Sequence, residues 1–62
     1  MNLQHFLTAQ HWAKERGAEI TRPEPHDDGF ECSVIRDGVA VYTAIRSTEN
    51  AAIQACIDDV LK

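Results

Sequence analysis

The sequence predicts one two-layer α+β domain over residues 1–62, in the order α-β-β-β-α, with an antiparallel sheet covered on one face by two helices. Two observations predict this class. The stretch from Phe30 to Ile45 alternates in polarity about a central turn, as a β-hairpin does. At both ends of the chain, apolar residues recur every three or four positions, as on one face of a helix.

The first helix is expected from Asn2 to Arg16, with Asn2 as its N-cap and Gly17 as the residue that ends it. At 100° per residue, five side chains share the face expected to be buried: Leu3, Phe6, Leu7, Gln10 and Ala13. Trp12 falls nearly opposite this face. It either folds over a neighbouring loop or is exposed for a partner.

A short strand is expected from Ala18 to Arg22, and a loop from Pro23 to Gly29, because "PEPHDDG" holds two prolines, two aspartates and a glycine. In the following hairpin, Asp37-Gly38 suits a type I′ turn, in which both central residues have positive φ. This turn predicts one face made of Phe30, Cys32, Val34, Arg36, Val39, Val41, Thr43 and Ile45. The other face is predicted as Glu31, Ser33, Ile35, Ala40, Tyr42 and Ala44.

The last helix is expected from Thr48 to Leu61, with Ser47 or Thr48 as its N-cap and Glu49 at its positive end. Its apolar stripe is predicted as Ala52, Ile53, Cys56, Ile57 and Val60. Cys32 and Cys56 both fall on core-facing positions. We expect two buried thiols, and a disulfide is the alternative that spacing alone does not decide.

Ten acidic residues against six basic ones give a net charge of −4. This balance disfavours binding to nucleic acid and to anionic membranes, which both need basic side chains. No apolar run is long enough to span a bilayer and no secretory signal is present, so a cytoplasmic protein is expected. The three histidines and two cysteines have no metal-ligand spacing and no catalytic arrangement. The chain is therefore expected to bind no metal or cofactor and not to be an enzyme.

The segment "PEPHDDGF" places His26 four residues before Phe30, and an alternating strand then leads to Gly38. With Ala52, Ala55 and Leu61 in the last helix, these residues resemble the double-stranded-RNA-binding domain over most of the chain. In that family, lysines at the start of the last helix bind phosphate. The corresponding positions here are Glu49, Asn50 and Ile53, so the resemblance implies the fold without its phosphate-binding cluster.

Four acidic residues fall within eight positions, and a fifth begins the last helix. Such a cluster could imitate a phosphate backbone in a basic groove, although a ridge that only aids solubility is the alternative. With two exposed aromatic candidates, the expected partner-binding set is Glu24, Asp27, Asp28, Glu31, Glu49, Tyr42 and Trp12.

The chain is therefore expected to be a small non-catalytic protein that inhibits or regulates a larger partner with a basic surface. Its size and charge are similar to those of phage-encoded inhibitors such as anti-CRISPR proteins. One alternative is a weak double-stranded RNA-binding module that uses His26 and Arg46. Another is a small toxin endoribonuclease, a class that shares this topology. The unpaired hairpin edge also offers a route to a homodimer.

Overall fold

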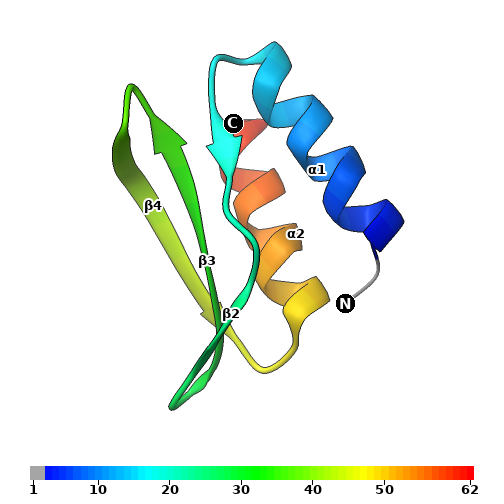
Figure 1. Ribbon diagram of the computed structural model, residues 1–62, viewed down its shortest axis with the longest axis vertical. Coiled ribbons are helices and arrows are strands. Elements are labelled where there is room, and N and C mark those ends of the chain that lie inside the picture. Colours follow the sequence, from blue (N-terminus) through cyan, green and yellow to red (C-terminus); the bar gives the residue numbers. More distant parts are fainter. Residues whose placement is uncertain (1–2) are drawn as a thin grey trace.

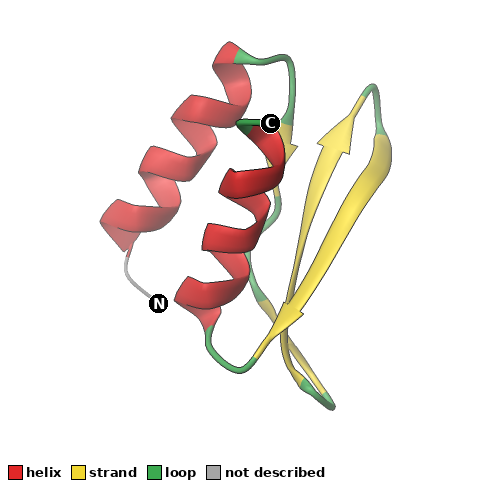
Figure 2. Cartoon of the chain, turned by 180° about the vertical axis from the view of Figure 1, so that it is seen from behind, coloured by secondary structure: helices red, strands yellow, loops and turns green. Residues whose placement is uncertain are grey.

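The computed structural model describes residues 3–62. Its elements are α1 (Leu3–Glu15), β1 (Glu19–Ile20), β2 (Glu24–His26), β3 (Gly29–Arg36), β4 (Val39–Arg46) and α2 (Glu49–Val60). In this part of the chain, four strands form one antiparallel sheet, and both helices lie on the same side of it (Figures 1 and 2). The predicted α+β class is confirmed.

The central strand of the sheet is β3. β4 pairs with β3 along one edge, so β1 and β2 share the other edge, one after the other. The loop predicted over residues 23–29 is wrong in part, because Glu24 to His26 form β2 and only Asp27 and Asp28 remain as a turn. Pro25 is tolerated in this strand because β2 lies at the edge of the sheet, where a missing N–H costs little.

The gap between β1 and β2 is bridged by a side chain. The Thr21 N–H donates to the Ser33 carbonyl oxygen at 2.9 Å, and the Thr21 hydroxyl oxygen accepts the Ser33 N–H at 2.9 Å. The hydroxyl thus replaces a backbone carbonyl in the ladder. β1 and β2 therefore act as one interrupted edge strand.

The predicted register of the β3–β4 hairpin holds only next to its turn. Asp37 and Gly38 have the expected positive φ of 53° and 78°. Val41 is then an extra residue, a β-bulge, so that Val34 pairs with Tyr42. From that point each β4 residue lies on the face opposite to the predicted one. Tyr42 and Ala44 face the helices, whereas Thr43 and Ile45 face outward.

The end of α1 is the one predicted. The Ala18 N–H donates to the Ala13 carbonyl at 2.9 Å and the Gly17 N–H to the Lys14 carbonyl at 3.1 Å, with Gly17 at φ 72°. This pair of bonds is a Schellman motif, for which glycine is suited because the position needs positive φ. The predicted N-cap, Asn2, lies outside the described residues.

The predicted buried face of α1 is wrong in part. Phe6 and Ala13 are buried, but Leu3 and Leu7 are 54% and 52% exposed, and Ala9 is buried instead. The reason is the position of α1, which packs against α2 and the edge strand β1 and not onto the middle of the sheet. This contact admits a narrow stripe of mostly small side chains.

Helix α2 matches its prediction closely. Thr48 is the N-cap, and its hydroxyl oxygen accepts the Ala51 N–H at 3.1 Å. The whole predicted stripe is buried: Ala52, Ile53, Cys56, Ile57 and Val60. This stripe packs onto β3 and β4 and forms the core with Ile20, Cys32 and Val34. Neither helix of the described chain is long and apolar enough to cross a membrane.

The two cysteines are free thiols in the middle of the core, as predicted, and both are fully buried. The Cys32 thiol donates to the Thr21 carbonyl oxygen at 3.0 Å. A hydrogen bond with Cys32, together with burial, raises the pKa of Cys56 well above its usual range. The same bond lowers the pKa of Cys32 against the effect of burial, so the pair retains one proton to high pH.

Candidate acidic partner-binding site

The β2–β3 hairpin brings two of the predicted site residues together. Glu24 and Glu31 are directly paired across the two strands. Because Cys32 and Val34 on β3 face the helices, the alternation of the strand turns Glu31 to the open face of the sheet. The two glutamates line a shallow groove of about 190 Å³ with Thr21, Arg22, Ser33 and Ile35.

The tip of this hairpin carries Asp27 and Asp28, and both are exposed. The tip extends past the connection between β4 and α2 (Figures 1 and 2). His26 is held in the turn, because its Nδ1 accepts the Asp28 N–H at 3.0 Å. Gly29 closes the turn at φ 135°, against the backbone of Arg46, where a Cβ atom would lie 2.1 Å from the carbonyl oxygen.

The charges of the hairpin have no ion-pair partner among the described residues. Among residues 3–62, none of the four hairpin carboxylates lies within 4.0 Å of a basic nitrogen; the ion pairs found there join Glu15 to His11 and Arg16 on α1. Arg22 lines the same groove, but its guanidinium carbon lies 5.9 Å from the centre of the Phe6 ring, towards α1. The hairpin therefore has an exposed, uncompensated negative charge.

Glu49 belongs to a different part of the surface. It lies in the first turn of α2 and lines a separate hollow with Phe30, Ser47, Thr48 and Asn50. Because α2 covers the inner face of the sheet, Glu49 does not share the open face with Glu24 and Glu31. The predicted acidic ridge is thus a cluster on the hairpin, with Glu49 beside it in the helix layer.

The other predicted residues do not join the acidic hairpin. Tyr42 is half-buried against the core and lines a hollow between β4 and α2, together with Arg46. Arg46 is exposed there, and its backbone lies against Gly29, the residue that pairs with His26 next to the hairpin tip. Trp12 is 40% exposed on α1, and the Arg16 guanidinium carbon lies 5.6 Å from the centre of its ring.

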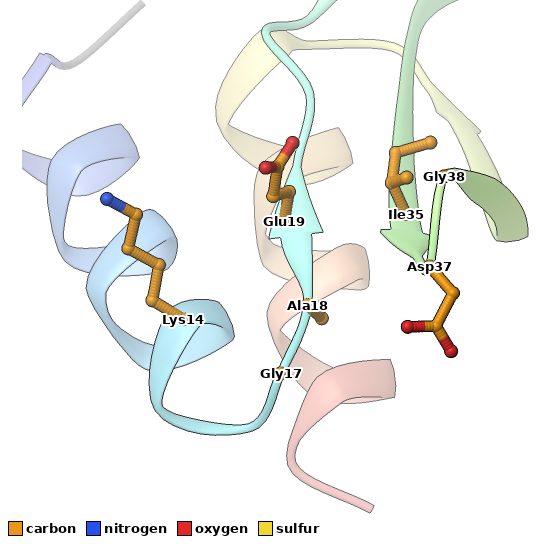
Figure 3. A pocket seen from close by; sticks show the side chains of 7 residues that line it. All are labelled: Lys14, Gly17, Ala18, Glu19, Ile35, Asp37 and Gly38. Atoms are coloured by element: carbon orange, nitrogen blue, oxygen red, sulfur yellow. The ribbon is translucent and has the colours of Figure 1, made fainter.

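Sequence reasoning missed Glu19. It pairs with Ile35, and the alternation of β1 turns it to the same open face as Glu24 and Glu31. Spacing alone gives no signal for it, since residues five apart on a regular strand face opposite ways; the one extra residue between β1 and β2 puts Glu19 and Glu24 on one face. Figure 3 shows Glu19 beside Ile35. Both residues line a hollow of about 360 Å³ together with Lys14 and Asp37.

The described residues offer carboxylates on an exposed surface, an arrangement that suits binding to cationic groups. No group of three His, Cys, Asp or Glu residues within residues 3–62 could hold a metal ion. Comparison of the chain with protein-family models, with curated proteins and with solved structures finds no match.

Proposed function

We propose that this chain is a small non-catalytic protein that inhibits or regulates a larger, nucleic-acid-binding partner. Its acidic hairpin would occupy a basic surface of that partner in place of a nucleic-acid backbone. The observation that carries the proposal is the direct pairing of Glu24 with Glu31, with Asp27 and Asp28 at the tip and no ion pair to any of the four carboxylates within residues 3–62. It would act in the cytoplasm, as small acidic phage-encoded inhibitors do.

The physical reason is that like charges directly opposite each other in a sheet are destabilising. A basic surface would relieve this repulsion, and it would gain most where water is excluded from the contact. The hairpin is also presented on the open face and beyond the body of the domain, so a partner reaches it without unfolding any element. Exposed charges that complement those of a partner raise the rate of association as well as specificity.

A set of charge-removing substitutions tests the proposal. The test variant carries Glu24→Gln, Asp27→Asn and Glu31→Gln. The control removes the same number of charges elsewhere, with Glu15→Gln, Asp58→Asn and Asp59→Asn. Partners are captured from a lysate, and the affinity of a captured nucleic-acid-binding protein is then measured with purified components.

We expect the hairpin variant to bind this partner at least about tenfold more weakly, equivalent to about 1.4 kcal/mol, and the control to bind as the wild type does. We also expect duplex nucleic acid to compete with the chain. Equal binding by both variants would overturn the proposal. A titration of the wild type with duplex RNA at low salt gives the other outcome, since saturable binding lost in His26→Ala and Arg46→Ala would indicate an RNA-binding module instead.

A further inference from the structure

The two edges of the sheet differ in their protection against pairing with another strand. The β1–β2 edge is short and interrupted, and Pro25 offers no N–H. The side-chain amide of Gln10 bonds both backbone groups of Ile20: its Nε2 donates to the carbonyl oxygen, and its Oε1 accepts the N–H at 3.1 Å. Glu19 and Glu24 add charges. Each of these features blocks the approach of another strand.

The β4 edge has almost none of this protection. β4 is eight residues long and, among residues 3–62, pairs with β3 alone; it has no proline, no glycine and no charge before Arg46. Three of its side chains, Val39, Val41 and Ile45, are 60%, 52% and 37% exposed. The bulge at Val41 is the single irregularity in this strand. Such an edge is a ready template for strand addition.

We propose that β4 pairs antiparallel with β4 of a second copy of this chain, so that the two sheets become one. Charge selects this occupant and this direction. Asp37 precedes the strand and Arg46 ends it, so antiparallel pairing brings Arg46 of each copy to the Asp37-Gly38 turn of the other. Parallel pairing would instead bring like charges together.

Asp37 is available for this contact. Its neighbour Arg36 is turned away, because the Arg36 guanidinium donates to the Arg16 carbonyl oxygen at 2.6 Å. Figure 3 shows the Asp37 carboxylate pointing away from Glu19 and Ile35, out beyond the end of β3.

A two-fold axis perpendicular to the sheet must pair one residue with its own counterpart. With Val41 left out as a bulge in both copies, Thr43 is that residue, and Arg46 lies opposite Val39, next to the Asp37-Gly38 turn of the other copy. A standard interface of roughly 800 Å² per partner would be about a fifth of the 3914 Å² surface of this chain. A strand edge buries less than this, so we expect a weak dimer that forms with rising concentration. The acidic hairpins would lie at its two opposite ends, since each hairpin tip is near the Arg46 end of β4.

Sedimentation velocity from about 10 µM to about 1 mM tests the proposal. We expect the wild-type mass to rise from one chain towards two. Arg46→Glu should weaken association at least about tenfold, because both symmetric contacts become repulsive. Arg22→Glu makes the same charge change at the opposite edge and should dimerise like the wild type. Circular dichroism shows that each variant is folded.

Amide hydrogen exchange on the wild type gives a readout that needs no substitution. We expect β4 amides to become more protected as the concentration rises, while the β1 amides stay unchanged. Should Arg46→Glu fail to fold, Val41→Lys places a charge at an already exposed position of the same edge and should also remain a monomer. A one-chain mass throughout the concentration range, or dimers of unchanged strength in the folded β4 variants, would overturn the proposal.

Discussion

Gln10→Met should destabilise the domain far more than the same substitution would at an exposed glutamine. The Gln10 amide makes two hydrogen bonds to the backbone of Ile20, a residue that is only 1% exposed. Methionine keeps the length of the side chain but bonds neither group. Each net hydrogen bond contributes about 1 kcal/mol, so we expect a loss of about 2 kcal/mol. For a domain of this size the total is roughly 3–9 kcal/mol, so the loss is a large fraction of it.

Urea denaturation followed by circular dichroism measures this loss directly, and a thermal scan should show a decrease in Tm of about 8–16 °C. Gln54→Met is the matched control. Its side chain donates to Asp58 at 3.0 Å on the exposed surface of α2, so the same substitution should cost less than about 0.5 kcal/mol there. A Gln10→Met loss no greater than the control would refute the reasoning, because it would mean that water satisfies the Ile20 backbone as well as Gln10 does.

Three further results are expected. Gly29→Ala should cost more than about 3 kcal/mol in urea denaturation, because its Cβ would lie 2.1 Å from a backbone oxygen, whereas Gly38→Ala, with open space around it, should cost about 1 kcal/mol from positive φ alone. The pKa of Cys56 is raised in the folded state, so its contribution to stability is complete below about pH 8.5 and is lost as the pH rises, because the unfolded chain then releases the proton. Because Cys32 and Cys56 titrate as a pair that keeps one proton in the folded state, the stability measured from pH 8 to 10 should fall more steeply in the wild type than in the Cys32→Ala/Cys56→Ala double variant, and equal slopes would contradict this. The fluorescence of Trp12, the single tryptophan, should be quenched by acrylamide in the folded protein, and full protection would contradict its exposure.

Where local chemistry determines the structure, the sequence was sufficient to predict it. The Asp37-Gly38 turn is required by positive φ at two successive residues, and the end of α1 by the same need at Gly17. The stripe of α2 is equally local, because Ala52 to Val60 repeat with the period of a helix over the whole element. Each of these features involves residues close together in the chain.

The features that the sequence missed depend on contacts between distant residues. The bulge at Val41 has no turn or glycine signal, yet it decides that Ala44 and not Thr43 is packed beneath α2. The exposure of Leu3 and Leu7 follows from the place where α1 docks, which a helical pattern does not contain. β2 escaped prediction because proline usually disfavours strands, whereas an edge position removes that penalty.

The candidate site was predicted at its centre and not at its periphery for the same reason. The hairpin acids are close in sequence, so any turn at Asp27 and Asp28 brings them together. The position of Tyr42 depends on the strand register, and that of Glu49 on where α2 packs.

The clustering of the hairpin acids links the stability of the fold to the proposed binding. Directly opposed like charges cost roughly 0.2–1 kcal/mol, so Glu24→Gln should stabilise the free domain by up to this amount in urea denaturation. The same substitution should weaken binding to a basic partner, because the charge that repels Glu31 is the one that would attract the partner. If Glu24→Gln raised both the stability and the affinity, or lowered both, the proposed role of the hairpin would be contradicted. The repulsion in the free chain and the attraction to the partner arise from one carboxylate, so the two quantities should change in opposite directions.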